Sequence, residues 1–127
     1  MVRDDQEQLS EEKAQIFHNA TAKALYVCKR ACPDIQTAVS FLTTRVKAPD
    51  EDDWKKLMHL MGYLKATMSL ALTLRDDGKG PHWWIDAAFG VHPDMRGHTG
   101  GTLSMGKGSI LSKSSKQKLN TLSSTEA

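Results

Sequence analysis

The stretch HWWIDAAFGV, His82–Val91, marks the point where the hydrophobic period of this sequence changes. Before it, apolar residues recur every three or four positions, which is the spacing of one buried helix face. The stretch itself is rich in aromatic and aliphatic residues, which favour a strand. We therefore expect an α+β chain in which a three-helix N-terminal segment precedes a small antiparallel sheet, and His82–Val91 supplies a strand of that sheet.

The helical part, from Ser10 to Met68, carries its own start and stop signals. Ser10 and Asp50 are favoured N-cap residues with acids in the turns that follow them, and Pro33 both ends one helix and opens the next. Three apolar sets follow the helical spacing, and we expect them to form the core: Phe17, Ala20, Ala24, Val27 and Ala31; Ile35, Ala38, Val39, Leu42 and Val46; Trp54, Leu57, Met58, Met61, Leu64 and Met68.

The second part of the chain reads as strands and turns. LALTL at 70–74 alternates as a strand does, and RDDGKGP around 75–80 is typical of a linker. Residues 97–117 predict a β-hairpin with its turn near 106–108. The last residues, 118–127, read as the start of a helix with Ser and Thr caps. The expected division is therefore 1–74, a linker at 75–80, and 81–127.

Composition and length narrow the class of protein. The chain has 127 residues with 39% hydrophobic and 25% charged residues, as in one globular domain. No apolar run reaches the ~18–20 residues that a membrane span needs, and the polar N-terminus is unlike a secretory signal. We expect an intracellular protein that does not associate with a membrane. We expect Cys28 and Cys32 to stay reduced in that compartment. We also expect His92 and His98 to be loop residues that bind no metal.

The distribution of charge offers a candidate nucleic-acid-binding segment. Asp and Glu are missing between Met95 and Thr125, whereas this span contains Lys107, Lys113, Lys116 and Lys118. Lysines beside glycines and hydroxyls can follow a phosphate backbone. Ordinary lysines on a solvated strand surface would give the same pattern, and charge alone favours this second interpretation.

Asp86 is the unusual residue of the predicted strand, because a carboxylate inside an apolar strand is costly unless it is paired or bound to a cation. One hypothesis is that one face of the strand is solvated and Asp86 points outward. The other is that Asp86 binds a hard cation such as Mg²⁺. Neither face of the strand is clearly polar, which tilts the balance slightly toward the metal. A two-metal site would need further acids from other elements.

Two blocks of sequence resemble copia-type retrotransposon polyproteins. The first, KRACPDIQTAVSFLTTRV with EDDWKKLMHLMGYLKAT (29–46 and 51–67), resembles the segment that follows the polymerase palm. The second, from Trp84 to Ala127, resembles the opening of the ribonuclease H domain. It contains the Asp86-Ala87 pair, the string S-x-S-x-K-Q at 112–117 and SSTEA at 123–127. Together the blocks cover the chain from about Leu9 to Ala127.

The resemblance implies a fold and an activity for the parent polyprotein. Residues 81–127 would be the first three antiparallel strands and the helix entry of a truncated ribonuclease H-like sheet, and Asp86 would be its first catalytic, metal-binding carboxylate. The family's second carboxylate would follow directly after Ala127, so Glu126 would be its neighbour. The parent would copy RNA into DNA and cleave RNA in RNA–DNA hybrids with Mg²⁺, in the cytoplasm or a virus-like particle.

The chain departs from the family because neither active centre is complete. The further ribonuclease H carboxylates are missing, and so is the polymerase motif Y-x-D-D. We therefore expect no catalysis by this chain alone and only weak, non-specific binding of an RNA–DNA hybrid or other nucleic acid. Its other partner would be the rest of the polyprotein. An alternative is a small stand-alone helical module that binds nucleic acid or protein. A complete hydrolase with one acid is disfavoured by metal chemistry.

Overall fold

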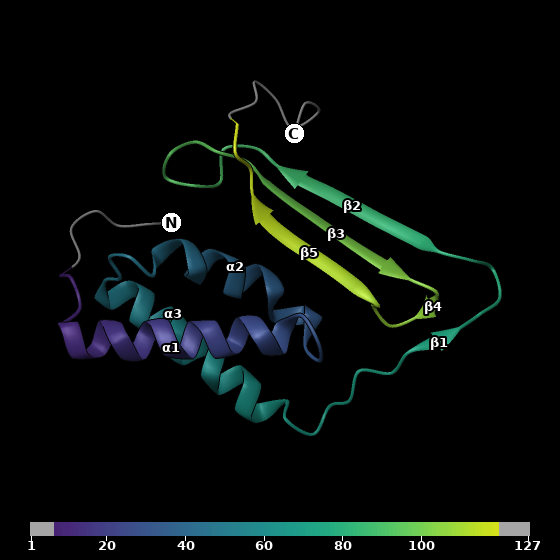
Figure 1. Ribbon diagram of the computed structural model, residues 1–127, viewed down its shortest axis with the longest axis horizontal. Helices are drawn as coiled ribbons and strands as arrows, with labels where there is room; N and C mark the ends of the chain where they lie inside the picture. The colour runs from purple at the N-terminus through teal and green to yellow at the C-terminus, as the bar shows by residue number, and fades with distance from the viewer. Residues whose placement is uncertain (1–6, 120–127) are drawn as a thin grey trace. The chain divides into compact units, whose positions relative to one another are not determined.

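The computed structural model describes residues 7–119, and the chain divides into two compact units, Met1–Ala71 and Leu72–Ala127 (Figure 1). The first unit contains α1 (Glu11–Cys28), the 3-10 turn η1 (Pro33–Ile35), α2 (Gln36–Arg45) and α3 (Glu51–Ala66). The second contains β1 (Arg75–Asp76), β2 (His82–Ala88), β3 (His98–Ser104), β4 (Gly106–Lys107) and β5 (Leu111–Lys116). Mixed helix and antiparallel sheet confirm the α+β class. Of the predicted helix start at 118–127, the structure describes Lys118 and Leu119, which are not helical, and residues 120–127 lie outside the described residues.

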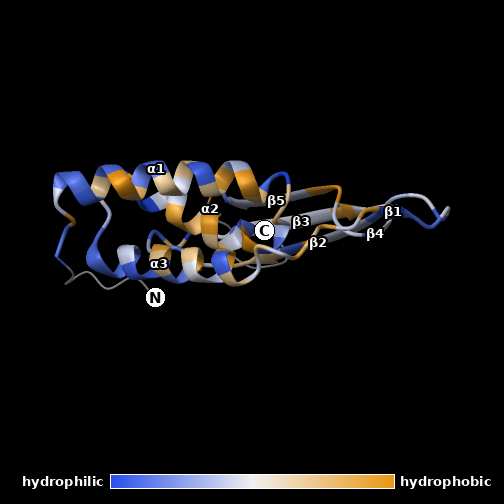
Figure 2. Cartoon of the chain, turned by 90° about the horizontal axis from the view of Figure 1, so that it is seen from below, coloured by the Kyte–Doolittle hydropathy of each residue, from blue (hydrophilic) through white to orange (hydrophobic). Residues whose placement is uncertain are grey.

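The helical unit has a closed hydrophobic core. Its helices alternate orange and blue along their length in Figure 2, as helices with one buried face do. Phe17, Val39 and Leu57 contribute one fully buried side chain from each helix. The rest of the buried apolar cluster is Leu9, Ala24, Cys28, Ile35, Leu42 and Leu60. Full burial of a side chain such as Leu or Phe stabilises a fold by roughly 1.5–3 kcal/mol, so this core is the main apolar contribution to the stability of the unit.

The predicted helix starts are confirmed, and two predicted ends are wrong. Ser10 Oγ accepts from the Lys13 backbone N–H, and Pro33 opens η1 directly before α2. α1 ends at Cys28, because the backbone N–H groups of residues 30, 31 and 32 all donate to the Val27 carbonyl. Ala31 is therefore exposed and outside the helix.

Met68 likewise lies beyond the end of α3, at Ala66, and is 84% exposed, so it is no part of the core. Met58 is 44% exposed although it lies within α3. Of the three methionines predicted for the core of this helix, Met61 is therefore the one that packs against it.

The start of α3 is fixed by a buried capping box. Asp50 Oδ1 accepts from the Asp53 N–H at 2.8 Å, and Asp53 Oδ2 accepts from the Asp50 N–H at 3.2 Å. Arg45 then donates to both carboxylates, at 3.0 Å to Asp50 and 2.8 Å to Asp53. The hydrogen bond to Asp53 is the main cause that raises the pKa of Arg45 above its ordinary value. The last turn of α2 is thus tied to the first turn of α3.

The second unit contains a three-stranded antiparallel sheet in the order β2-β3-β5. Trp83 pairs with Leu103, and Leu103 pairs with Leu111, which sets the register of all three strands. The predicted hairpin is confirmed. Its turn needs glycine at Gly108, where φ is +76° and a Cβ would lie 2.2 Å from the Thr73 carbonyl oxygen.

The predicted strand at 70–74 is wrong. These residues have no regular structure, and Leu70 and Leu74 are exposed at 73% and 54%. The alternating pattern has no partner strand in the described part of the chain, and a lone strand leaves its backbone groups without ladder hydrogen bonds. The short strand β1 lies instead in the predicted linker 75–80, where it pairs with β4 as a separate two-stranded sheet.

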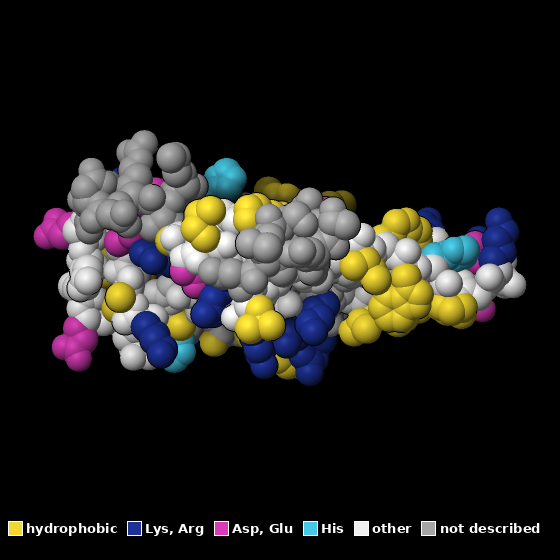
Figure 3. Space-filling view, turned by 90° about the horizontal axis from the view of Figure 1, so that it is seen from above, with side chains coloured by type: hydrophobic (Ala, Val, Ile, Leu, Met, Phe, Trp, Pro, Cys, Tyr) yellow, Lys and Arg dark blue, Asp and Glu magenta, His cyan; other side chains and the backbone are white. Residues whose placement is uncertain are grey.

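Large apolar side chains of this second unit are open to solvent. Trp83, Trp84 and Ile85 are 58%, 54% and 76% exposed, and Phe89 is 43% exposed. Yellow hydrophobic side chains are correspondingly visible on the surface in Figure 3. Ser104 and His92 are the buried side chains of the unit among the described residues, and both are polar. The sheet therefore has no apolar core of its own in residues 72–119.

Candidate functional site

Strand alternation assigns the candidate residues to two faces of the β2-β3-β5 sheet. Asp86 pairs with Gly100, and Gly100 pairs with Ser114. We call the surface on this side the Asp86 face. Its members are His82, Trp84, Asp86 and Ala88 from β2; His98, Gly100, Thr102 and Ser104 from β3; and Ser112, Ser114 and Lys116 from β5. The string S-x-S-x-K therefore places its three specified side chains on the same face as Asp86.

Asp86 is exposed, and its Oδ1 accepts a hydrogen bond from the Ala87 backbone N–H at 2.9 Å. A solvated carboxylate keeps most of its hydration, so the desolvation cost that made Asp86 unusual in the sequence does not arise. Gly100 separates Asp86 from Ser114 without a side chain. A Cβ at Gly100 would make only ordinary contacts of 3.9 Å and longer, so the sheet could accommodate a small side chain at this position.

The described residues do not fit a complete magnesium site. Across residues 7–119, no three His, Cys, Asp or Glu side chains are grouped so that they could hold a metal ion. Asp86 offers one carboxylate, whereas a two-metal site requires several that converge from different elements. Mg²⁺ usually keeps several waters and is held by one or two carboxylates together with substrate phosphates, so Asp86 alone supplies at most part of such a site.

The four predicted nucleic-acid-binding lysines are not one patch. Lys113 is exposed on the opposite face from Asp86, and Lys107 belongs to the two-stranded sheet. Lys118 is exposed after the end of β5. Lys116 lies on the Asp86 face but forms an ion pair of 2.6 Å with Asp94, whose pKa this hydrogen bond lowers.

A hydrogen-bonded chain of side chains links the loop after β2 to the Asp86 face. His92 Nε2 lies 3.0 Å from His98 Nδ1, and His98 Nε2 lies 2.6 Å from Ser114 Oγ. His92 is buried, with 5% of its surface exposed. Burial is the main cause that lowers the pKa of both histidines. The prediction that His98 is a loop residue is wrong, because it begins β3 and pairs with Lys116.

The positions of the ring protons on His92 and His98 follow from the requirement that a buried N–H group has an acceptor. His92 Nδ1 is buried and has no partner among the described residues. A buried N–H without an acceptor costs more than an unused lone pair, so the proton of neutral His92 belongs on Nε2. His92 then donates to His98 Nδ1, and His98 donates from Nε2 to Ser114 Oγ. His98 is thus a donor toward Ser114, which removes it as a base that would activate this hydroxyl.

The loop between β2 and β3 is tied down at both ends. The His92 N–H donates to the Arg96 carbonyl at 3.2 Å, and the Gln117 N–H donates to the Gly97 carbonyl at 2.9 Å. Gln117 Nε2 also donates to Thr99 Oγ1 at 2.8 Å. Lys116 and Gln117, at the end of the S-x-S-x-K-Q string, therefore hold the loop. Lys116 pairs with Asp94, and Gln117 bonds to Gly97. Sequence reasoning missed this arrangement, although the two-residue alternation of Ser112, Ser114 and Lys116 was a signal for a shared face.

Comparisons with known proteins add no family assignment: no family model, curated protein or solved structure matches the chain. Within the described residues, no helix combines the length and the apolar composition that crossing a membrane would require.

The histidine chain predicts that the stability of the sheet unit depends on pH. Because burial lowers the folded-state pKa of His92 and His98, the unfolded chain binds more protons below its ordinary histidine pKa of about 6.5. Stability is therefore complete above that pH and falls as the pH drops through the lower folded-state values. Thermal unfolding followed by the NMR amide signals of β2, β3 and β5, from about pH 7.5 to about pH 5, should show this loss.

The His92→Asn variant should flatten this pH dependence. The matched control is His18→Asn on the exposed surface of α1, which removes one histidine of the helical unit and should leave the slope unchanged. Equal slopes in the His92 variant and the parent chain would contradict the assignment.

Proposed function

We propose that this chain is part of a copia-type retrotransposon reverse transcriptase and ribonuclease H polyprotein. In this proposal residues 1–74 correspond to the segment after the polymerase palm, and residues 81–127 to the first half of a ribonuclease H-like domain. Asp86 is the first catalytic carboxylate and a ligand for Mg²⁺ in the parent enzyme. The parent acts on RNA–DNA hybrids in the cytoplasm or within a virus-like particle.

The observation that carries the proposal is the placement of the family motifs on the sheet. The Asp86-Ala87 pair lies on β2, which is the first strand of the antiparallel order β2-β3-β5. The S-x-S-x-K residues Ser112, Ser114 and Lys116 follow on β5 and face the same side as Asp86. This is the order of elements that the resemblance implies, and it supports the proposal.

The same proposal requires that the isolated chain be inactive. Asp86 is the single acid on its face of the described sheet, so residues 7–119 do not supply the convergent carboxylates that clamp attacking and leaving oxygens. The resemblance puts the second carboxylate directly after Ala127 and the others further along the polyprotein. Asp86 would bind Mg²⁺ too weakly on its own to support hydrolysis.

A cleavage assay on a labelled RNA–DNA hybrid tests this function. The 127-residue chain should cleave no faster than buffer with Mg²⁺, whereas a version extended through the rest of the polyprotein's domain should cleave. Asp86→Asn should abolish cleavage by the extended version, and Asp94→Asn, which removes a carboxylate of the loop, should retain cleavage. Cleavage by the short chain that Asp86→Asn abolishes would contradict the proposed position of the active site, as would an extended protein indifferent to Asp86.

Nucleic acid binding by the described residues should be weak and electrostatic. Lys107, Lys113 and Lys118 are exposed, and none of them forms an ion pair within the described residues. Lys116 is held by Asp94 and should contribute less, because a lysine that forms an ion pair must give it up before it contacts phosphate. The proposed surface is therefore sequence-independent and sensitive to salt.

Salt titrations of hybrid binding between about 50 and about 200 mM check this assignment. Lys113→Ala should weaken binding and lower the salt slope by about 1, the effect of one lost phosphate contact. Lys116→Ala should change the slope by clearly less, and Asp94→Asn should tighten binding because it frees Lys116. Tight binding insensitive to salt, or equal losses in the two lysine variants, would contradict the account.

A further inference from the structure

The loop between β2 and β3, residues 89–97, contains a strained backbone conformation. Met95 has a φ of +59°, in the left-handed region that costs a residue other than glycine about 1–2 kcal/mol. Its N–H donates to the His92 carbonyl at 2.8 Å, and the His92 N–H donates to the Arg96 carbonyl at 3.2 Å. Strain of this kind persists only where surrounding contacts hold it. The contacts between the loop and the strands therefore decide whether the loop stays closed.

Two side-chain contacts tie this loop to the sheet. In the first, His92 Nε2 lies 3.0 Å from Nδ1 of His98 on β3. In the second, Asp94 forms an ion pair of 2.6 Å with Lys116 on β5. His98 and Lys116 are register partners on neighbouring strands. Both contacts therefore close the loop onto the same end of the sheet.

The two histidine rings have no place for an added proton while the loop is closed. The proton of neutral His92 lies on Nε2 and is donated to His98 Nδ1, so a proton added to His98 Nδ1 would put two N–H groups face to face. A proton added to His92 Nδ1 would create a buried N–H that has no partner among the described residues. A buried donor without an acceptor costs about 1–3 kcal/mol, and more when it is charged. Protonation of either ring therefore opposes the closed loop.

The charges around the two rings oppose protonation as well. Lys116 and Arg96 already share the Asp94 carboxylate, at 2.6 Å and 3.4 Å. Burial, Lys116 and His98 together outweigh the attraction of Asp94, so the pKa of His92 is lowered. The hydrogen bond from Lys116 lowers the pKa of Asp94, so this carboxylate stays charged in mild acid. Protonation of both rings would add two positive charges beside the two that Asp94 already shares.

We propose that His92 and His98 form a pH-sensitive switch, whose protonation releases the loop from the sheet and frees Lys116 from Asp94. At neutral pH the loop is closed, and Lys116 is held by its ion pair. In the open loop both rings reach solvent and bind protons with the ordinary histidine pKa of about 6.5, so a pH below this value favours opening. The inference goes beyond the loss of stability predicted above, because the strands stay paired while the loop opens.

The freed Lys116 would strengthen nucleic acid binding at low pH. It lies on the Asp86 face beside the hydroxyls of β5, and it would no longer have to give up an ion pair before it contacts phosphate. This consequence rests on the proposed function. The opening of the loop does not, because it follows from the contacts within the sheet unit.

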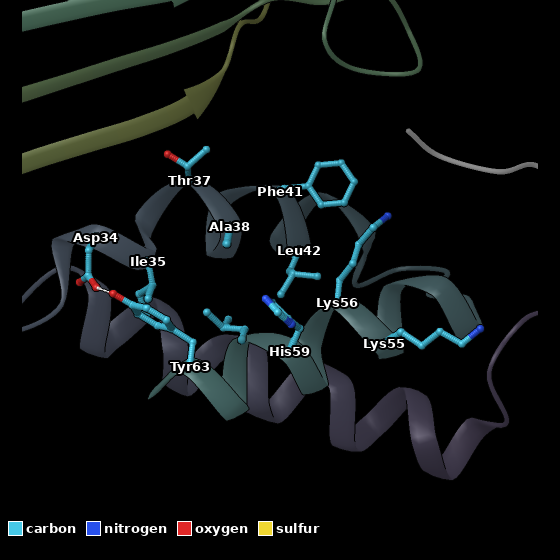
Figure 4. A pocket seen from close by; sticks show the side chains of 11 residues that line it. Asp34, Ile35, Thr37, Ala38, Phe41, Leu42, Lys55, Lys56, His59 and Tyr63 are labelled. Carbon is cyan, nitrogen blue, oxygen red and sulfur yellow. Dashed lines mark hydrogen bonds between the residues drawn. The ribbon is translucent and has the colours of Figure 1, made fainter. Parts of the chain in front are cut away.

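His59 supplies a matched control from the helical unit. Its ring is exposed on α3, and Figure 4 shows it among the side chains that line the groove between α2 and α3. A proton added to an exposed ring remains in contact with water, so it requires no buried acceptor. Substitution of His59 therefore removes one histidine without touching the switch.

NMR spectra of the 127-residue chain at about pH 7.5 and about pH 5 test the opening without any nucleic acid. The amide signals of Met95 and Gln117 report on the loop, because Gln117 donates to the Gly97 carbonyl. They should move toward unstructured positions at the lower pH, while the Leu103 signal of β3 keeps its folded position. Each histidine that titrates freely only in the open loop raises the ratio of open to closed loop by up to about thirtyfold over this range.

Two substitutions of His92 bracket the switch. His92→Gln should keep the loop closed at about pH 5, because an amide does not titrate and can offer His98 Nδ1 either a donor or an acceptor. His92→Ala should open the loop at both pH values and so supply the signals of the open state. His59→Gln should behave as the parent chain does.

Binding of a labelled RNA–DNA hybrid, followed by fluorescence anisotropy, tests the release of Lys116. The gain in affinity from about pH 7.5 to about pH 5 should be at least about threefold larger in the parent chain than in His92→Gln. Lys116→Ala should remove most of this difference, because the lysine that the open loop frees is then missing.

Three outcomes would overturn the proposal. Loop signals that are unchanged by pH in the parent chain, or that shift equally in His92→Gln, would rule out the switch. Loss of the folded Leu103 signal in step with the loop would mean that the whole sheet unfolds. An open loop with equal gains in hybrid binding for the parent and His92→Gln would contradict the release of Lys116. Absence of hybrid binding by every variant would instead contradict the proposed function, and the NMR spectra would still decide the switch.

Discussion

A β-sheet must bury at least one apolar face, and this requirement governs how the two units of the chain differ. In the sheet unit Trp83 and Ile85 lie on one face and Trp84 on the other, and all three are more than half exposed. Backbone pairing sets the register of β2, β3 and β5, but a small sheet without a packed face is only marginally stable. The sheet that carries Asp86 therefore has no packed apolar face within the described residues.

The helical unit meets the same requirement by itself. Its three helices each place a fully buried side chain in one core, and Arg45 ties α2 to the capped start of α3 through Asp50 and Asp53. Removing one member of such a buried network leaves charges without partners, which commonly costs about 3–5 kcal/mol. The helical unit is thus held together by its own contacts, whereas Asp86 lies on a sheet that has no apolar core among the described residues.

The sequence predicts the elements that depend on local signals. The caps Ser10 and Asp50 and the break at Pro33 act within a few residues, and the structure confirms all three. The predicted strand Leu70–Leu74 is wrong because an alternating hydrophobic pattern does not show whether a partner strand exists. The prediction that Met68 is a core residue is wrong because the helical spacing of apolar residues continues in the sequence beyond the end of α3.

The candidate site is predictable only in part, because its contacts depend on strand register. Asp86 could be chosen as an unusual carboxylate in an apolar strand, and the structure puts it in solvent. The chain from His92 through His98 to Ser114 joins a loop, β3 and β5, and no local pattern indicates that these residues meet. The pairing of Lys116 with Asp94 arises in the same way, which is why four lysines in one segment do not form one patch.

Residue-by-residue native-state hydrogen exchange, measured by NMR at low protein concentration, tests the central claim that the helices close their own core and the sheet does not. Backbone amides in the middle of α2 and α3, such as those of Val39 and Leu57, should exchange only through global opening of the helical unit. Amides of the central strand β3, such as that of Leu103, should be at least about tenfold less protected, a difference of about 1.4 kcal/mol in opening free energy. Protection in β3 equal to that of α2 and α3 would contradict the account, because the sheet would then be stable without further cover.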